Sequence, residues 1–239
     1  MTTEPSVHES SSVNPLQGLD KHSLLLAVAT LILLSAFSVI TLSISLFALG
    51  YGLDNSLQPL PLALSIFFGL LLTYPLIMRA SKNYFRQVFI PQLKSTPLWL
   101  MISVGTGVVL ALLVNQATSI VTPPEGMETT VQTIMQGETL AVVLVYVSVI
   151  LFAPFFEEYL FRGLIFDGYH HRYGFFIATI VSSVIFMAFH LLEYYDYWVA
   201  SVAITLLAIV LATIRFKSQS LLNPILCHMT YNLTIILLA

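Results

Sequence analysis

Three ionisable residues stand inside a hydrophobic run, residues 155–162, whose sequence is FFEEYLFR. They are Glu157, Glu158 and Arg162, in a chain in which only 9% of the residues are charged. Ionisable side chains are costly at membrane depth, and those found there usually pair, face a cavity and serve a function. These three residues are therefore the first candidates for chemistry.

Helix geometry gives the three residues different roles. Glu158 and Arg162 are four residues apart and lie on one face of a helix, so that Arg162 can neutralise Glu158. Glu157 points about 100° away and lacks this partner, which makes it a candidate general base. Pro154 removes a backbone hydrogen bond and can open the helix beside Glu157. The alternative is a structural Glu–Arg clamp with a second glutamate in a water-filled pocket.

Further polar residues lie downstream in apolar surroundings, at His190 and at His228 with Asn232. His228 and Asn232 are four residues apart, so both point the same way along a helix. Taken alone, His190 could be a structural or interfacial histidine, and the His228–Asn232 pair could form hydrogen bonds between helices. Taken together with Glu157, these residues indicate a buried polar site.

The composition identifies the class of protein that must position this site. The chain has 239 residues, 57% of them hydrophobic, and a mean hydropathy of +0.89. A single cysteine, Cys227, excludes an intramolecular disulfide and a cysteine-based zinc cluster. We expect an all-α, polytopic transmembrane helix bundle in which about seven apolar runs approach the ~20 residues that a spanning helix needs. The runs are His22–Gly50, Pro61–Met78, Pro97–Ile120, Thr139–Phe156 with an extension, Gly174–Leu191, Trp198–Ile214 and Leu222–Ala239.

Basic residues fall only in alternate connections between these runs. The connections 51–60, 121–138 and 192–197 contain no Lys or Arg. By the positive-inside rule, this pattern predicts a cytoplasmic N-terminus and an external C-terminus. The protein is then expected in the lipid bilayer, with a bacterial inner membrane favoured as its location.

Three regions are expected along the chain. Residues 1–21 are polar and predict a disordered cytoplasmic tail. Residues 22–138 predict the first three spans, a packing scaffold, followed by an outer loop with a short amphipathic helix. Residues 139–239 contain the polar site between the fourth, fifth and seventh helices. The fourth helix is expected to continue past Phe156 and to end at Gly168 and the polar stretch 169–173.

Helix rise allows the polar residues to meet. Measured from the expected helix ends at 1.5 Å per residue, Glu157 lies ~17 Å deep, His190 ~24 Å, His228 ~9 Å and Asn232 ~15 Å. These depths overlap once helix tilt is allowed for.

The motifs resemble those of the CAAX prenyl protease and bacteriocin-processing family (CPBP or Abi), intramembrane proteases that include the type II CAAX prenyl proteases. The family carries Glu-Glu-x-x-x-Arg, Phe-x-x-x-His and His-x-x-x-Asn, each on a transmembrane helix. In this sequence these motifs are Glu157-Glu158…Arg162, Phe186…His190 and His228…Asn232. The resemblance covers about residues 139–239, and members often have eight helices.

The resemblance implies an intramembrane endopeptidase in which Glu157 and His190 activate a water molecule. It further implies that His228 and Asn232 stabilise the oxyanion and that Glu158 and Arg162 support the site. We favour a mechanism without a cofactor. The alternative is a zinc metalloprotease with Glu157, His190 and His228 as ligands.

The expected partner is a membrane-associated, prenylated or leader peptide, or a small membrane protein, and no nucleic acid is expected. A non-catalytic membrane protein, such as an immunity factor, a regulator or a transporter, is the alternative from another class. The substrate, the organism and the oligomeric state are not determined by the sequence.

Overall fold

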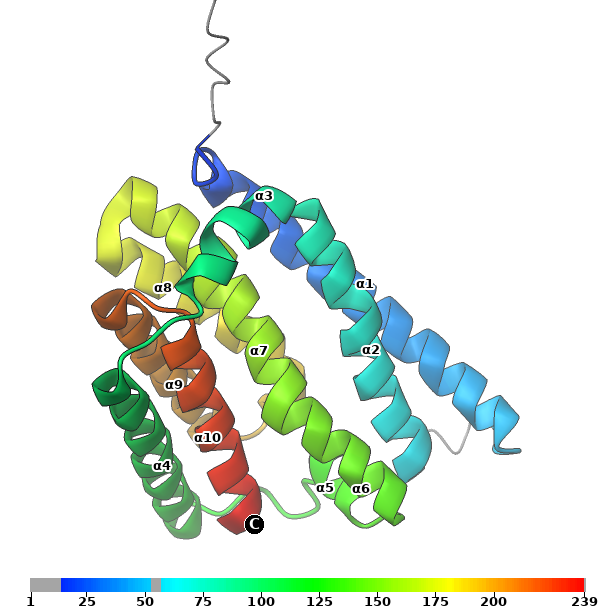
Figure 1. Cartoon of the computed structure of the whole chain (residues 1–239). Coiled ribbons are helices and arrows are strands. Elements are labelled where there is room, and N and C mark those ends of the chain that lie inside the picture. The colour runs from blue at the N-terminus through cyan, green and yellow to red at the C-terminus, as the bar shows by residue number, and fades with distance from the viewer. Residues whose placement is uncertain (1–13, 53–56, 239) are drawn as a thin grey trace, which may run out of the picture.

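The computed structural model describes residues 14–52 and 57–238, and every regular element within these ranges is helical, which confirms the predicted all-α class (Figure 1). The α-helices are α1 (Leu19–Ala48), α2 (Pro59–Ala80), α3 (Lys82–Tyr84), α4 (Pro97–Ile120), α5 (Thr130–Met135), α6 (Thr139–Tyr146), α7 (Ala153–Glu158), α8 (Phe166–Tyr194), α9 (Trp198–Ser218) and α10 (Leu222–Leu238). A π-helical turn at Phe85–Phe89 and a 3₁₀ turn at Ile90–Gln92 follow α3.

One continuous helical run forms the centre of the bundle. It contains α6, a π-helical segment at Val147–Phe152, α7, a second π-helical segment at Tyr159–Ile165 and the start of α8. In Figure 1 this run crosses the molecule between the α1–α2 pair and the group formed by α4, α9 and α10. Because π-helical segments have a wider turn and frequently mark functional sites, the two that flank α7 draw attention to the residues between them.

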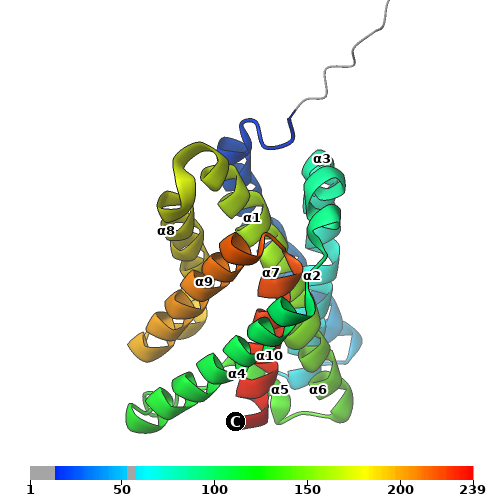
Figure 2. The ribbon, with the colours of Figure 1, turned by 60° about the vertical axis from the view of Figure 1, so that its left-hand side comes forward.

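The end of this run differs from the expectation that Gly168 and residues 169–173 would stop the helix. The helix continues through Tyr173, and the break falls at Gly174, with φ 80° and ψ −179°. Only glycine adopts this backbone region readily, because a side chain would clash there. Figure 2 shows the ribbon turning back between α7 and the labelled part of α8.

Gly168 has a packing role instead. A Cβ atom at this position would lie 2.8 Å from the backbone nitrogen of Asp20 and 2.9 Å from the carbonyl carbon of Leu19. The missing side chain therefore lets the start of α1 lie against the start of α8. Arg172 adds an ion pair to Asp20 at 2.9 Å.

The predicted tail, residues 1–21, lies mostly outside the described residues. At its described end the structure differs from the prediction, because residues 15–18 form a turn and residues 19–21 belong to α1. The short helix expected in the outer loop is confirmed as α5, which Thr129 and Gln132 cap at its N-terminus.

Five helical segments among the described residues are long and apolar enough to cross a membrane, and the protein is an integral membrane protein. They are Leu19–Ala48, Pro59–Ala80, Pro97–Ile120, Thr139–Leu191 and Trp198–Ser218. The fourth segment is 53 residues long and includes the break at Gly174, while Leu222–Leu238 is apolar but shorter. The exact count of seven spans stays a prediction.

Helix pairs support the central run on two sides. α1 packs along α2, and α4 packs along α10. α4 and α10 can approach closely because Gly107 has no side chain. A Cβ atom at this position would lie 2.5 Å from the carbonyl oxygen of Cys227. The first three spans were expected to be a scaffold, and this contact shows how one of them sets the position of the helix that carries His228 and Asn232.

Candidate active site

The expected pair between Glu158 and Arg162 lies in the centre of the bundle. Arg162 Nη1 lies 2.9 Å from Glu158 Oε1, and both side chains are fully buried. Arg162 Nη2 also donates to the carbonyl oxygen of Ala208 in α9, at 3.0 Å. A buried ion pair needs such additional hydrogen bonds because desolvation of two charges is costly. The pair therefore joins the central run to α9.

His228 from α10 lies between the two neighbouring glutamates. Its Nδ1 is 3.0 Å from Glu158 Oε1, and its Nε2 is 3.9 Å from Glu157 Oε2. The Glu158 contact fixes the orientation of the ring, because Nδ1 donates to a carboxylate that is itself held by Arg162. Glu157 is less enclosed than Glu158, since 17% of its side chain is exposed against none of that of Glu158. The ring thus presents Nε2 on the side of the more accessible carboxylate.

Asn232, one turn after His228, binds the central run directly. Its side-chain amide donates a hydrogen bond to the carbonyl oxygen of Val149, at 2.8 Å. In the π-helical segment the N–H of Ala153 bonds to the carbonyl of Ser148, five residues back. The next bond in this register would join the N–H of residue 154 to Val149, but Pro154 has no N–H. The Asn232 amide therefore satisfies the carbonyl that the proline leaves free.

His190 contacts Phe186, which in turn packs against His228 and Arg162. Its Nδ1 bonds to the carbonyl oxygen of Phe186 at 2.8 Å, and because a carbonyl only accepts, Nδ1 carries the proton. The Phe186 ring centroid lies 4.6 Å from that of His190 and 5.8 Å from that of His228. Arg162 lies over the same ring, 4.5 Å from its centroid. Phe186 is thus the residue around which the two imidazoles and the arginine gather.

The structure therefore brings together four of the six predicted residues through direct contacts: Glu157, Glu158, Arg162 and His228. Asn232 contacts the same helical run at Val149, and His190 contacts Phe186. Within residues 14–52 and 57–238, no group of three or more His, Cys, Asp or Glu side chains is arranged to hold a metal ion. The donor set Glu157, His190 and His228 does not fit a zinc ion in this arrangement.

Two residues that the sequence argument did not single out as site residues contribute to these surroundings. Phe186 was noted only as part of the Phe-x-x-x-His motif, although the three-residue gap that places it one turn before His190 is visible in the sequence. Tyr74 in α2 stacks on Phe156, the neighbour of Glu157, with ring centroids 4.4 Å apart. No sequence signal distinguishes Tyr74, because it lies in an apolar span with no charged neighbour.

A second buried network lies at the end of the bundle near α3. Arg215 Nη2 lies 2.8 Å from Asp167 and 2.6 Å from Gln92 Oε1, and the Tyr84 hydroxyl donates to Asp167 at 2.7 Å. These residues come from α9, α8, the 3₁₀ turn and α3, so the network ties four elements together. All of its charges are paired, which fits a structural role.

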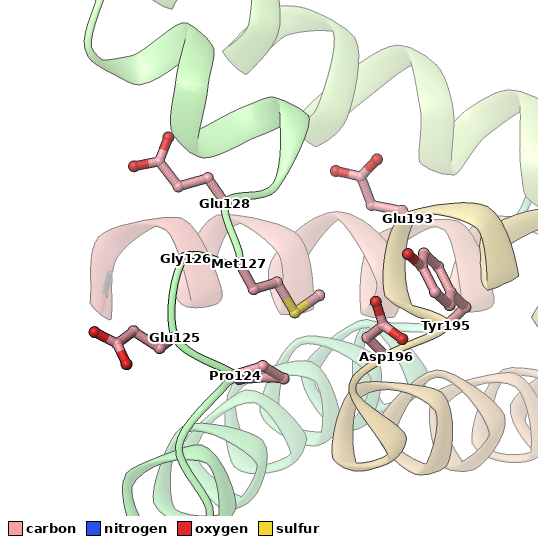
Figure 3. A pocket seen from close by; sticks show the side chains of 8 residues that line it. All are labelled: Pro124, Glu125, Gly126, Met127, Glu128, Glu193, Tyr195 and Asp196. Carbon is pink, nitrogen blue, oxygen red and sulfur yellow. The ribbon is translucent and has the colours of Figure 1, made fainter.

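A cavity of about 380 Å³ lies apart from these residues, between the α4–α5 connection and the α8–α9 connection (Figure 3). Its lining includes four carboxylates, those of Glu125, Glu128, Glu193 and Asp196. Glu193 is already engaged, because its carboxylate accepts hydrogen bonds from the backbone N–H and the hydroxyl of Thr130 at the start of α5. None of the six predicted site residues lines this cavity.

The part of the chain that contains the site is similar to a known family. Residues 139–234 match the family model described as type II CAAX prenyl endopeptidase Rce1-like. This match confirms the resemblance that the three motifs indicated, and all three motifs lie within the matched segment. An uncharacterized 24.3 kDa protein of Escherichia coli is 29% identical over 90 residues, which are 37% of this chain and 41% of that protein. No solved structure matches the chain.

Proposed function

Because residues 139–234 match the type II CAAX prenyl endopeptidase family, we propose that the protein is an intramembrane endopeptidase that hydrolyses a peptide bond with a water molecule activated by Glu157. The observation that carries this proposal is the position of His228. It stands between Glu158, which orients it at 3.0 Å, and Glu157, at 3.9 Å. A gap of 3.9 Å is too long for a direct hydrogen bond but allows a water molecule to bridge the two groups.

The proposed reaction begins with this water. Glu157 accepts a proton from the water while the oxygen of the water attacks the carbonyl carbon of the scissile bond. The resulting oxyanion needs donors that are already in place. We assign this role to the doubly protonated form of His228, whose Nδ1 donates to Glu158 and whose Nε2 then donates to the oxyanion. Asn232 is the second donor, because its amide has a second N–H besides the one that binds Val149. The C–N bond then breaks, and the proton passes to the leaving amine.

We assign to His190 the transfer of this proton, which its Nε2 accepts and then passes to the leaving amine. Its Nδ1–H is committed to the Phe186 carbonyl, so Nε2 of the neutral ring is an acceptor. Glu158 and Arg162 are supporting residues that hold His228 and the central helix run. This mechanism uses no cofactor.

The proposed substrate is a membrane-associated peptide, either one with a prenylated cysteine near its C-terminus or a leader peptide. The deciding experiment uses purified full-length protein in detergent and an internally quenched peptide with a farnesylated cysteine followed by three residues. A membrane-anchored leader peptide without a prenyl group is assayed in parallel. Wild-type protein is expected to cleave one of the two peptides.

Glu157→Gln is expected to abolish this cleavage, because glutamine cannot accept the proton of water. Glu128→Gln in the outer loop is the matched control and should cleave like wild type. A Glu157→Gln protein that folds and cleaves at the wild-type rate would end the proposal. Absence of cleavage by wild-type protein, together with a cellular function that survives the loss of His190 or of Asn232, would instead favour the non-catalytic alternative.

We also propose that the N-terminus lies in the cytoplasm of a bacterium whose inner membrane holds the protein. The support is the restriction of Lys and Arg to alternate connections. Single cysteines placed at Gln17 and at Glu125 in a Cys227→Ala background test this orientation. A thiol reagent that cannot cross membranes should label position 125, and not position 17, in intact cells.

A further inference from the structure

A second cavity, of about 320 Å³, lies between the start of α1 and the junction of α2 with α3. In Figure 1 this place is near the top of the molecule, where the dark blue start of α1 comes close to α3. One wall is formed by the turn before α1 and the first turns of α1, and the other by residues 80–84. None of the six predicted site residues lines this cavity.

The lining of the cavity combines apolar and polar side chains. Leu25 and Leu26 belong to a helix that is long and apolar enough to cross a membrane, and 69% of Leu25 is exposed. Gln17, Lys82 and Asn83 contribute polar groups to the same cavity. Such a cavity at the end of a membrane-spanning helix fits a molecule that has both an apolar chain and a polar head group.

The charge around the cavity is positive. Lys82 lines it, and Lys21, Arg79 and Arg86 lie within two residues of lining positions in the chain. All four are exposed. Within residues 14–52 and 57–238, none of the four forms a salt bridge. Their positive charges therefore remain available to an anion.

The two carboxylates that lie close to this region in the described part of the chain are already paired. Asp20 accepts from Arg172 at 2.9 Å, and Asp167 accepts from Arg215 at 2.8 Å. Both carboxylate side chains are almost fully buried, with 6% and 7% exposed. They do not neutralise the exposed lysines and arginines beside the cavity.

We propose that this cavity binds an anionic phospholipid. The phosphate of the head group lies against Lys82, in the positive field to which Lys21, Arg79 and Arg86 contribute, and an acyl chain follows Leu25 along α1. Lys and Arg next to a membrane-spanning helix attract anionic lipids by the same electrostatics. The proposal goes beyond the proposed peptidase activity and does not depend on it.

Hydrogen bonds connect the cavity wall to the central run. The Ser81 hydroxyl bonds to that of Tyr159 at 2.5 Å, and the Tyr84 hydroxyl donates to Asp167 at 2.7 Å. A ligand that binds only the folded protein stabilises it. A lipid that fills this cavity should therefore raise the midpoint of thermal unfolding.

The experiment titrates delipidated, full-length protein in detergent with dioleoyl phosphatidylglycerol, which is anionic, or with dioleoyl phosphatidylcholine, which has the same chains and no net charge. The unfolding midpoint at each lipid concentration gives an apparent dissociation constant. Phosphatidylglycerol is expected to bind more tightly, and added salt should weaken its binding, because salt screens exposed charges. Glycerol 3-phosphate, a soluble phosphate without acyl chains, should leave the midpoint unchanged.

Variants then locate the site. Lys82→Gln should weaken phosphatidylglycerol binding about fivefold, the effect of one basic residue near an anionic membrane surface. Lys94→Gln is the matched control, because Lys94 is exposed in the α3–α4 connection but does not line the cavity. Ala80→Phe keeps every charge but fills the cavity, so it should also weaken binding.

Equal affinities for the two lipids would overturn the proposal. So would a Lys94→Gln effect as large as that of Lys82→Gln, since the attraction would then belong to the whole basic surface. Wild-type affinity in both Lys82→Gln and Ala80→Phe would show that the lipid binds elsewhere. A midpoint raised equally by glycerol 3-phosphate would show that the ligand is a soluble phosphate and not a lipid.

Discussion

The side-chain amide of Asn232 replaces the backbone N–H that Pro154 lacks, by donating a hydrogen bond to the Val149 carbonyl at 2.8 Å. A proline that opens the central helix is thereby compensated from another helix. Asn232 holds α10 on the central run one turn after His228, which lies beside Glu157. Asn232 thus has a structural role at the Val149 carbonyl besides its proposed role as a donor to the oxyanion.

A double-mutant cycle tests this relationship. Asn232→Ala should lower the free energy of unfolding by about 1–2 kcal/mol, the upper range for hydrogen bonds between membrane helices. In a Pro154→Ala background the N–H of residue 154 can bond to Val149, so the same substitution should cost less. Asn115→Ala, at an exposed position of α4, is the control and should have no effect. Equal costs in both backgrounds would show that Pro154 does not create the need for Asn232.

The Glu158–Arg162 pair predicts a large loss of stability when one partner is removed. Arg162→Met leaves a buried carboxylate without its cation and should destabilise the protein by about 3–5 kcal/mol. The double variant Glu158→Gln/Arg162→Met should recover most of this loss but remain inactive, because His228 loses its charged partner. Thermal unfolding in detergent and peptide cleavage measure the two effects.

Arg172 provides the matched control for this prediction. Its ion pair with Asp20 has the same 2.9 Å length, but 53% of the Arg172 side chain is exposed. Arg172→Met should therefore cost no more than about 1 kcal/mol. A similar loss for both arginines would mean that burial does not set the cost.

The close approach of α4 and α10 predicts different effects for two glycines in the same helix. A Cβ atom at Gly107 would lie 2.5 Å from the Cys227 carbonyl oxygen, whereas one at Gly105 would meet nothing within 4 Å. Gly107→Ala should displace α10 and lower both the unfolding midpoint and the cleavage rate. Gly105→Ala should be neutral or slightly stabilising, since alanine favours the helix. Equal behaviour of the two variants would contradict this packing.

Metal content decides between the two hydrolytic mechanisms. Purified active protein is expected to contain far less than one zinc ion per chain by elemental analysis, and chelator treatment should leave cleavage unchanged. Stoichiometric zinc whose removal abolishes cleavage, and whose return restores it, would show that the Glu157, His190 and His228 side chains rearrange around a metal ion.

The sequence by itself determined the helical class and most helix boundaries, because these depend on local hydrophobic runs and on the ~20-residue length set by the bilayer. It also determined the Glu158–Arg162 pair, since residues four apart on a helix must be neighbours. Its account of the end of the fourth helix was wrong. A glycine stops a helix only when its backbone leaves the helical region, as Gly174 does, and Gly168 serves packing instead.

Only the tertiary structure decided which residues meet across helices. The motif spacing did not reveal that His228 contacts Glu158, that Asn232 binds Val149, or that Phe186 packs against both imidazoles. It also gave no reason to single out Tyr74. These contacts depend on helix tilt, rotation and the prolines and π-helical turns that shift register, and neighbouring helices set such features rather than the sequence of one helix.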